Sequence, residues 1–559
     1  IPGTYNLKLN VTDENFDTSS IAITVNVSSN TRTPIYLSSS TGNDNNNGGS
    51  PSTAIQTPAR ANQLLSNNSM LLIKRGDTVY TETGQFILDS LYNVVVKPYG
   101  SGNMPLLWGD DTLYTGNPAH IEILKGGTVL IDSIAFSCPT EPSYQEPYGD
   151  PYKGIQAFYN DFNDLAVRGC YFDNVSSCVS VWNLNSPTVE GVFLLNNEAE
   201  VVGKYLFYGE AKNGTIIDNG CAGTTDGHCL RLYGGPYNVT NNRLWYDYNE
   251  LLNQEALGVA ASFPLDLVVG SDFYVAGNEL HQGMFVGYLT QYGITSVSDV
   301  VINGNLFIRR SHYVPSIEIF PGDSNIFISN NIFDHRDSIH NQTAIRFQEL
   351  NLGVPGDSIP IYNVKVYHNT FFNSTPFGTF INIESPPSSG SRYIFANNLH
   401  LQPQFEGGVI FGWDPYMVTA AIGLDSINFE YNVWQDPVSG DPFRINGNYI
   451  SESNWNTSYP NDSFYPCSSS DFNLISNNNY TPLAGTLPDN FCPNTPGVFN
   501  DFNGNIRPTG MTTAGAIDLN GLVVSSTKDI KPVTTNVKVY PNPFNPTTTI
   551  QFSVETHRN

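Results

Sequence analysis

A short pattern that returns seven times is the feature that most constrains how this chain can fold. Each copy joins an alternating strand to an asparagine and two or three apolar residues, as in "VTNNRLW", "VINGNLF" and "VYHNTFF". The shortest interval is 26 residues (Asn305 to Asn331) and the longest is 38 (Asn331 to Asn369). A period of this length predicts a solenoid in which each copy supplies one coil and the loops vary in length. The repeated asparagines are Asn242, Asn278, Asn305, Asn331, Asn369, Asn398 and Asn432.

We expect these asparagines to be structural. Each stands where the chain must turn after a strand, and Asn tolerates the left-handed backbone conformation that tight turns need. Identical side chains on successive coils stack, so their amides should bond to one another along the axis of the solenoid.

A second set of strands precedes the asparagine pattern and includes "YLFYG", "CLRLY", "LGVAA", "FVGYL", "SIEIF", "AIRFQ" and "FINIE". Alternation places Leu230 and Leu232 inward, and likewise Ile317 and Ile319. Neither helices nor two-residue Asn-Gly hairpins separate the strands, which argues against an α/β fold and a propeller. The pattern therefore predicts an all-β coil of parallel strands, with about a dozen rungs between residues 70 and 435.

Two further segments carry a resemblance to known proteins. "IYLSSSTGNDNNNGGSPSTAIQTPARANQLL" resembles the N-terminal entry of secreted right-handed parallel β-helix proteins of the pectate-lyase-like class, and "ARANQLL" is the expected capping helix. "DFNGNIRPTGMTTAGAIDLNG" resembles the closing segment of the same proteins. The resemblance implies that residues 31–520 form one right-handed parallel β-helix (solenoid).

The two ends of the chain resemble other modules. Residues 1–30 are similar to the last hairpin of a cadherin-like or PKD-like immunoglobulin-type domain, in which Asp13 and Glu14 can bind Ca²⁺; a solvated turn explains both residues as well. After a linker over 521–536, "VYPNPFNPTTTIQFSV" within residues 537–559 resembles the start of the type IX secretion C-terminal sorting domain. That resemblance implies a bacterial protein exported across the outer membrane and secreted or held at the cell surface.

Composition limits the partners. Lys+Arg 25 against Asp+Glu 51 gives a formal net charge of −26, which argues against nucleic acid and anionic membranes. No stretch is long and apolar enough to predict a membrane span. Both terminal segments expose strand edges, so we expect them to fold back or be disordered, or else to self-associate into filaments. The pairs Cys221 with Cys229 and Cys467 with Cys492 are possible disulfides, and buried thiols are the alternative.

Candidate site residues come from stacking the "CLRLY" set of strands. This alignment places Arg231, Glu318 and Arg346 on the outward side, with Gly258 and Gly287 as a shallow floor between them. A carbohydrate can lie on such a floor, because strands about 4.8 Å apart are close to the repeat of one sugar ring. A plain cross-strand ion pair is the simpler interpretation of Glu318 and Arg346. The aromatic residues expected to stack on sugars are Phe207, Tyr233 and Phe320.

Acid–base groups are expected beside this row. Asp226 and His228 enter the "CLRLY" strand together, so His228 can act as a general acid or base. Arg231 can neutralise a substrate carboxylate for β-elimination, or Asp226 and Glu210 can form an acid/base pair for hydrolysis. Taken singly, each residue is as well explained as a turn or surface residue.

The leading interpretation is an extracellular protein that binds a polysaccharide and cleaves it, by lyase or hydrolase chemistry. The alternative is a structural cell-surface or filament-forming rod without catalysis. The sequence predicts no cofactor with certainty beyond the possible Ca²⁺, and it does not identify the sugar.

Overall fold

The structure is a computed structural model. It describes residues 2–12, 18–81, 84–109, 119–139, 153–158, 162–182, 189–224, 227–246, 263–290, 293–308, 315–336, 343–348, 361–373, 378–384, 392–402, 417–420, 427–437, 440–465, 480–495 and 497–522.

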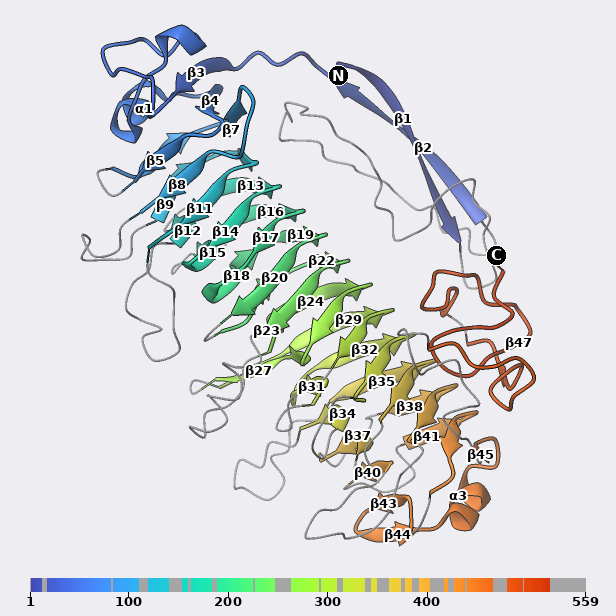
Figure 1. Cartoon of the computed structure of the whole chain (residues 1–559). Coiled ribbons are helices and arrows are strands. Elements are labelled where there is room, and N and C mark those ends of the chain that lie inside the picture. Colours follow the sequence, from blue (N-terminus) through green and yellow to red (C-terminus); the bar gives the residue numbers. More distant parts are fainter. Residues whose placement is uncertain are drawn as a thin grey trace.

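The chain winds into a right-handed parallel β-helix whose rungs follow one another along a single axis (Figure 1), so the predicted fold class is confirmed. Each rung contributes to three faces, called A, B and C in chain order. Strands of neighbouring rungs pair in parallel on every face; for example, Ile317 lies opposite Ile345. Among the described strands of the main sheet, antiparallel pairing occurs only where β43 meets β44 (Asn448–Ile450); β27 (Tyr288–Thr290) and β28 (Gly293–Thr295) form a separate antiparallel pair between β26 and β29.

Face A is the face that carries the predicted site. Its strands are β6 (Phe86–Leu91), β9 (Ala119–Gly126), β12 (Lys153–Phe158), β15 (Val175–Trp182), β18 (Val202–Ala211), β21 (Leu230–Gly234), the start of β24 (Leu265–Ala276), β26 (Met284–Val286), β31 (Ile317–Ile319), β34 (Thr343–Phe347), β37 (Thr379–Ile383), β40 (Val418–Ala420) and β43 (Phe443–Ile445).

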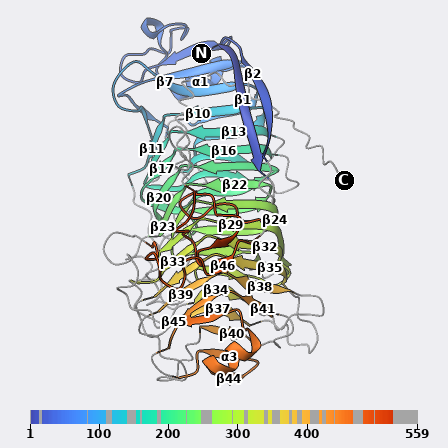
Figure 2. The same ribbon diagram turned by 90° about the vertical axis from the view of Figure 1, so that its right-hand side faces the viewer.

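Face B crosses the axis as a regular stack in Figure 2. Its strands are β3 (Thr33–Leu37), β4 (Ser69–Lys74), β7 (Val94–Tyr99), β10 (Val129–Asp132), β13 (Phe162–Arg168), β16 (Val189–Leu195), β19 (Asn213–Ile217), β22 (Tyr237–Thr240), the rest of β24, β29 (Val297–Asn303), β32 (Ser324–Ser329), β35 (Tyr362–Tyr367), β38 (Tyr393–Ala396) and β41 (Ile427–Glu430).

Face C completes each rung with short strands. These are β5 (Thr78–Tyr80), β8 (Leu106–Trp108), β11 (Ala135–Ser137), β14 (Tyr171–Asp173), β17 (Glu198–Ala199), β20 (Gly220–Thr224), β23 (Arg243–Tyr246), β25 (Glu279–His281), β30 (Leu306–Ile308), β33 (Ile332–Asp334), β36 (Thr370–Phe372), β39 (Leu399–Leu401), β42 (Val433–Gln435) and β45 (Ser463–Tyr465).

The interior is a continuous apolar core closed at both ends by short helices. Leu230, Leu232 and the other alternating residues of face A point inward and are fully buried, as predicted. At the start, α1 (Pro58–Leu64) has Thr57 as its N-cap, whose side chain accepts from the Arg60 N–H. At the other end, Trp455 of α3 (Glu452–Ser458) stacks on Phe443 with ring centroids 3.6 Å apart. The helices cover the apolar ends of the stack, which would otherwise be open.

The predicted asparagine ladder is confirmed, and it runs along the corner between faces B and C. Each Oδ1 accepts from both the backbone N–H and the Nδ2 of the preceding asparagine, as Asn331 does from Asn305 at 2.9 and 3.0 Å. Each Nδ2 also donates to a carbonyl of the previous rung, such as that of Val275 for Asn305, at 2.9 Å. The ladder is longer than predicted, because Asn197 and Asn219 precede the seven repeats.

Asp462 terminates the ladder. Its Oδ1 accepts from the N–H and Nδ2 of Asn432 at 2.9 and 3.1 Å. Its Oδ2 accepts from the indoles of Trp434 and Trp455 at 2.9 and 3.1 Å. A carboxylate suits this position because it only accepts hydrogen bonds, so no amide donor is left without a partner at the end of the column.

One detail of the predicted turn is wrong. The left-handed residue is the one before each ladder asparagine, for example Asn241 with φ 56° before Asn242 and Tyr431 with φ 55° before Asn432. The ladder asparagine itself lies between this turn residue and the start of the face C strand. Its side chain is therefore selected for the hydrogen bonds it makes, and the preceding residue is selected for the turn.

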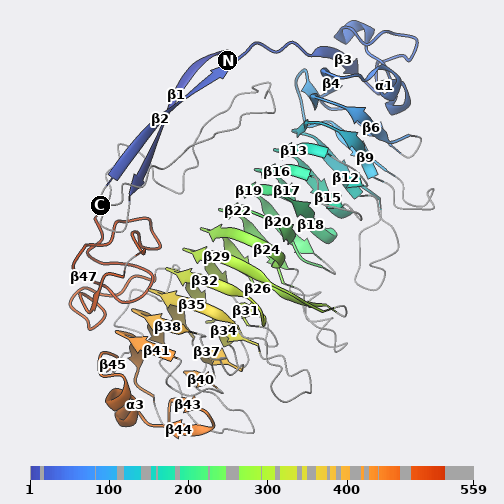
Figure 3. The same cartoon turned by 180° about the vertical axis from the view of Figure 1, so that it is seen from behind.

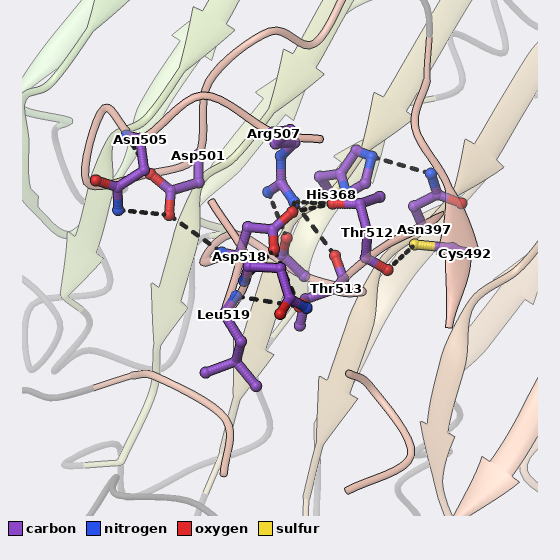
Figure 4. A network of polar contacts seen from close by, with 12 residues as sticks. His368, Asn397, Cys492, Asp501, Asn505, Arg507, Thr512, Thr513, Asp518 and Leu519 are labelled. Atoms are coloured by element: carbon purple, nitrogen blue, oxygen red, sulfur yellow. Dashed lines mark hydrogen bonds and ion pairs between the residues drawn. The ribbon is translucent and has the colours of Figure 1, made fainter. Parts of the chain in front are cut away.

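A segment over residues 480–522 packs on the outside of faces B and C (Figure 4). The buried Arg507 donates to the Asn330 Oδ1 at 2.8 Å and to the carbonyls of Gly515 and Ala516 at 2.8 and 3.1 Å. Its Nη1 lies 3.4 Å from an Asp518 carboxylate oxygen. The segment thus binds the turn residues of the lower rungs and belongs to the β-helix unit.

The predicted hairpin at the start of the chain is present as β1 (Gly3–Thr12) paired antiparallel with β2 (Thr18–Val27). Its assignment to an immunoglobulin-type domain stays a prediction. Asp13 and Glu14, the possible Ca²⁺ ligands, lie outside the described residues, and so do residues 523–559 with the sorting-domain motif. None of the helices in the described ranges is long and apolar enough to cross a membrane.

The suggested disulfide between Cys221 and Cys229 is wrong, because both residues are free, buried thiols. Cys492 is also a buried thiol, and its suggested partner Cys467 lies outside the described residues. In the described coil, cysteine acts as a small apolar core residue.

Candidate functional site on face A

The strands of face A can be followed from β12 to β40 in Figure 3, and their outward side chains form one row. Strand register fixes their order from one rung to the next. The row reads Gln156, Ser180, Tyr208, Arg231, Asp266, Phe285, Glu318, Arg346, Asn382 and Thr419.

This register corrects three of the predicted positions. Phe207 lies opposite Leu230 and is fully buried in the core, so it cannot stack on a substrate, and Tyr208 takes its outward place. Gly258 lies outside the described residues; Asp266 occupies the predicted rung. Phe285, two residues before Gly287, is the outward residue of the next rung. The row therefore has a carboxylate and an aromatic ring where a flat glycine floor was expected.

Arg231, Asp266 and His228 form the first polar cluster in the row. The Arg231 Nε lies 3.2 Å from the Asp266 Oδ2, with 16% of the arginine side chain exposed and none of the aspartate. The His228 Nε2 lies 3.6 Å from the same oxygen. On its other side, the His228 Nδ1 lies 2.8 Å from the carbonyl oxygen and 3.3 Å from the backbone nitrogen of Phe263. Arg231 is the member of this cluster that reaches solvent.

Burial sets the protonation states of the cluster. It raises the pKa of Asp266 to about 7, although the neighbouring Arg231 opposes the rise. It lowers the pKa of His228 to about 3, and Arg231 adds to that shift. His228 is therefore neutral at physiological pH, and its approach to Asp266 is a polar contact and not an ion pair. An imidazole with so low a pKa is a poor proton acceptor, so the structure gives His228 a positioning role.

Aromatic side chains surround the exposed edge of Arg231. Its guanidinium lies 5.9 Å from the ring centroid of Tyr233. The Tyr208 ring meets that of Tyr233 edge to face with centroids 5.8 Å apart, and Trp182 stacks on Tyr208 with centroids 5.1 Å apart. Burial raises the pKa of Tyr205 and of Tyr233, against the influence of Arg231. All three phenols are protonated at neutral pH and can donate hydrogen bonds.

Glu210 lies on β18, the strand that pairs with the Arg231 strand β21. It lies opposite Tyr233 in register and is partly exposed. Burial raises its pKa. A partly exposed carboxylate with a raised pKa is a better proton acceptor than an ordinary one.

A second polar cluster lies further along the row, beyond Phe285. Arg346 holds Glu384 through two hydrogen bonds, from Nε at 2.9 Å and Nη2 at 3.0 Å. The same guanidinium places Nη1 3.3 Å from the Oε1 of the buried Glu318. Gln348 donates to that oxygen at 2.5 Å. The predicted pairing of Glu318 with Arg346 is therefore present, as part of a larger network.

The predicted site residues thus separate into two groups. Arg231 and Glu318 are three rung steps apart, about 14 Å at the usual strand spacing. Between them Phe285 contacts Phe320 edge to face, with centroids 5.3 Å apart, and Phe320 is buried. Asp226 lies outside the described residues.

Asp266, Tyr208 and Trp182 are the site residues that sequence reasoning missed. Asp266 stands alone in "FPLDLVV", where an acidic residue interrupts an apolar alternation, and this signal was readable. It was missed because "LGVAA" was taken as the strand of that rung, eight residues too early.

The described residues hold no group of three or more His, Cys, Asp or Glu that could bind a metal ion.

Comparisons with known proteins find similarity only among solved structures. No family model matches the chain, and no curated protein matches it. Among solved structures, a pectate lyase, Pel9A, is 12% identical with a TM-score of 0.33, over 88% of this chain and 96% of that chain. XylC in complex with xylose is 7% identical with a TM-score of 0.43, over 88% and 99%. The catalytic unit of a GH87 alpha-1,3-glucanase from Streptomyces thermodiastaticus is 14% identical with a TM-score of 0.42, over 78% and 72%. At these values the likeness says nothing about the activity of this chain.

Proposed function

We propose that face A binds an extracellular polysaccharide that contains acidic sugars and cleaves it by β-elimination next to Arg231. The observation that carries the proposal is the pairing of the partly exposed Arg231 with a fully buried Asp266 whose pKa is raised to about 7. The partly exposed guanidinium of Arg231 therefore lies against a carboxyl whose pKa is close to neutral pH.

The charge of the pair explains why an anionic ligand fits. When Asp266 is protonated, the pair of Arg231 and Asp266 loses its negative charge, and the guanidinium lies beside Tyr205 and Tyr233. A uronate carboxylate can replace that charge, because guanidinium pairs with carboxylates through two parallel hydrogen bonds. Stacked Trp182 and Tyr208 offer the apolar surface that sugar rings use.

The residues around Arg231 can supply each part of the elimination. Arg231 neutralises the carboxylate on C5, which makes the C5 proton more acidic. Glu210 accepts that proton, the C4–O bond breaks as the C4–C5 double bond forms, and Tyr233 donates its proton to the departing oxygen. Exchange with water then returns both residues to their starting states. Asp266 and His228 hold Arg231 in place and act as positioning residues.

A polysaccharide panel tests the proposal directly. Purified protein is incubated with acidic and neutral polysaccharides, and each reaction is read for ultraviolet absorbance of unsaturated ends and for new reducing ends. Unsaturated ends from an acidic polymer are expected. Reducing ends without the absorbance would show hydrolysis and overturn the elimination mechanism, and no product from any polymer would remove the enzymatic part of the proposal.

A non-catalytic rod is the second candidate, and a specific observation favours it. The ladder from Asn197 to Asp462 is fully hydrogen-bonded over ten rungs of the coil, as a stiff spacer at the cell surface would require. Self-association through the β1–β2 hairpin would extend such a rod. Electron microscopy with and without residues 1–30 separates the two functions, because only the rod predicts filaments that need the hairpin.

The location remains part of the proposal. Secretion to the cell surface rests on the sorting-domain resemblance of residues 537–559, and an extracellular polysaccharide is the substrate that such a location offers.

A further inference from the structure

We infer that residues 480–522 form a strap that is released from the coil in acid, and that protonation of His368 releases it. The strap lies on the outer side of faces B and C, over the turn residues of the lower rungs (Figure 4). The inference concerns a conformational change of the β-helix and does not depend on the proposed function.

The strap covers an apolar strip on the outer side of face C. Strand alternation points these side chains of the coil outward, and each is at most 5% exposed because the strap packs on it. The strip consists of Ile332, Phe372, Leu399, Leu401 and Val433. Release of the strap would expose these side chains to water, so hydrophobic burial favours the attached state.

Asn397 holds the strap at two points. Its backbone carbonyl accepts from the Gly515 N–H at 2.8 Å. Its Nδ2 donates to the carbonyl of Pro493 at 2.8 Å and to the hydroxyl of Thr495 at 2.8 Å. The same Nδ2 lies 2.9 Å from the His368 Nε2. A carbonyl only accepts hydrogen bonds, so the contact with Pro493 fixes the orientation of the Asn397 amide.

This arrangement requires a neutral imidazole. An amide nitrogen only donates, so the His368 Nε2 must accept and can carry no proton. Protonation would place an N–H group of the imidazolium against the N–H groups of the amide. If the Asn397 amide turned over to present its oxygen instead, it would lose its bonds to Pro493 and Thr495. Protonation of His368 is therefore incompatible with attachment of the strap at Asn397.

Burial and charge also oppose the imidazolium. His368 is fully buried, and burial lowers its pKa well below the ordinary value; the buried Arg507 of the strap adds to that shift. The turns of the coil beside His368 contribute the uncharged Asn330 and Asn397. A released, solvated His368 would regain a pKa of about 6.5. The attached state therefore binds the proton more weakly, so attachment is most stable above about pH 6.5 and weakens as the pH falls.

The other titratable groups of the strap near this turn do not favour release in acid. The Asp518 carboxylate lies 3.4 Å from the Arg507 Nη1, and Asp501 accepts from the Asp518 N–H at 3.1 Å. Burial raises the pKa of Asp501 and of the Cys492 thiol. A carboxyl with a raised pKa takes up a proton more readily in the attached state, so Asp501 acts against His368.

The Cys492 thiol can report release of the strap. It is buried and donates to the carbonyl of Thr512 at 3.4 Å. The full chain is treated with dithiodipyridine, a thiol reagent that works in acid, and the rate at Cys492 is divided by that of the urea-unfolded chain at the same pH. This relative rate should rise about twentyfold between about pH 7 and about pH 5, since only the released state takes up the proton. An unchanged relative rate would overturn the inference.

Cysteines inside the coil are internal controls. Cys170 and Cys221 are buried thiols of the coil, so they should stay unreactive at both pH values. If they reacted in step with Cys492, the whole coil would be unfolding, and release of the strap alone would be wrong. These wild-type rates decide the inference even if a variant does not fold.

His368→Asn removes the titratable group and should keep the turn. His368 has φ 53°, and Asn330 and Asn397 occupy the same turn position with φ 53° and 60°. The relative rate at Cys492 should be almost independent of pH in this variant. A rise equal to that of the wild type would show that His368 is not the group that releases the strap.

His281→Asn is the matched control. His281 is a partly exposed histidine of face C, and its Nε2 lies 2.7 Å from the Oε1 of Glu279. This variant should show the same rise at Cys492 as the wild type. Loss of the rise in His281→Asn as well would mean that the pH dependence does not come specifically from His368, which contradicts the inference.

Discussion

The same rungs form the corner between faces B and C and the outward row of face A. The residue type repeats from rung to rung at the corner and varies along face A. At the corner, the same residue type returns on nine successive rungs, and every amide has its partners. Along face A, neighbouring rungs carry Tyr208, Arg231, Asp266, Phe285 and Glu318, with no two alike.

The difference follows from what each position can exchange with water. A buried amide must find protein partners, and an identical neighbour one rung away supplies them at the right spacing. Outward residues such as Arg231 and Arg346 are partly exposed, so stability alone does not dictate their type. The residues along such a row can therefore be selected for binding a ligand. The regularity at the corner indicates a structural role.

The largest effect is expected at the corner. Asn305→Ala removes four hydrogen bonds, two accepted from Asn278 and two donated to Asn331 and Val275. The free energy of unfolding should fall by about 3–5 kcal/mol, the range for breaking a buried network. Urea unfolding measures the loss.

Asn238→Ala is the control for that change. Asn238 is an exposed residue of β22 on the outward side of face B. Its loss should change stability by less than about 0.5 kcal/mol. Equal losses of stability for the two substitutions would show that the ladder asparagines contribute no more than an exposed asparagine does.

The next effect is expected on face A and concerns activity. Arg231→Ala should lower kcat/KM on the polymer found in the panel about a hundredfold, since a charge that stabilises the transition state is lost. Because Arg231 is mostly buried and pairs with the buried Asp266, its loss can also lower stability, so activity is compared for the folded fraction. Arg231→Lys should recover only part of the activity, as an ammonium lacks the planar fork. A large loss of stability with unchanged activity in the folded fraction would place Arg231 with the corner residues.

A smaller effect is expected in the pH dependence of stability. The folded chain raises the pKa of Asp266 to about 7, whereas the unfolded chain has the ordinary value of about 3.9. The folded state therefore holds this proton more tightly, and the stability it contributes is lost as pH rises from about 4 through about 7. The free energy of unfolding of the wild type, minus that of Asp266→Asn, should fall by about 2 kcal/mol between about pH 5 and about pH 8. A difference that is flat with pH would show that Asp266 stays ionised.

The smallest effect returns to the corner. Ser133 has φ 59°, in the same turn position that Asn196 and Asn241 occupy on later rungs. Ser133→Asn should raise the free energy of unfolding by about 0.5 kcal/mol, because Asn tolerates this conformation better. Ser133→Val should lower it, since a β-branched residue is strained there. Equal urea unfolding midpoints for the two variants would show that the turn conformation is not the reason why asparagine occurs at this position.

Sequence reasoning reached the fold and the ladder because both depend on repetition. When the same residue type recurs in every rung, the recurrence predicts whether that position is buried. The inward leucines and isoleucines and the asparagine column could therefore be predicted from the sequence. The same reasoning reached Arg231 and Arg346 as outward residues, because alternation alone decides that in a regular strand.

What only the tertiary structure decided is the register of the irregular rungs. Between β23 and β24 the chain runs through residues 247–262 before the next face A strand begins at Leu265, and no local signal tells which of two apolar runs pairs with β21. A register error of one residue moves a side chain to the other side of the strand, which is why Phe207 was placed outward.

The chemistry of the site was likewise decided by the fold. The sequence by itself determined that charged residues would lie outward on face A. It could not determine that Asp266 would be buried beneath Arg231, or that two glutamates would share Arg346, because these contacts join residues from separate rungs. Protonation states depend on burial, and burial exists only once the rungs are stacked.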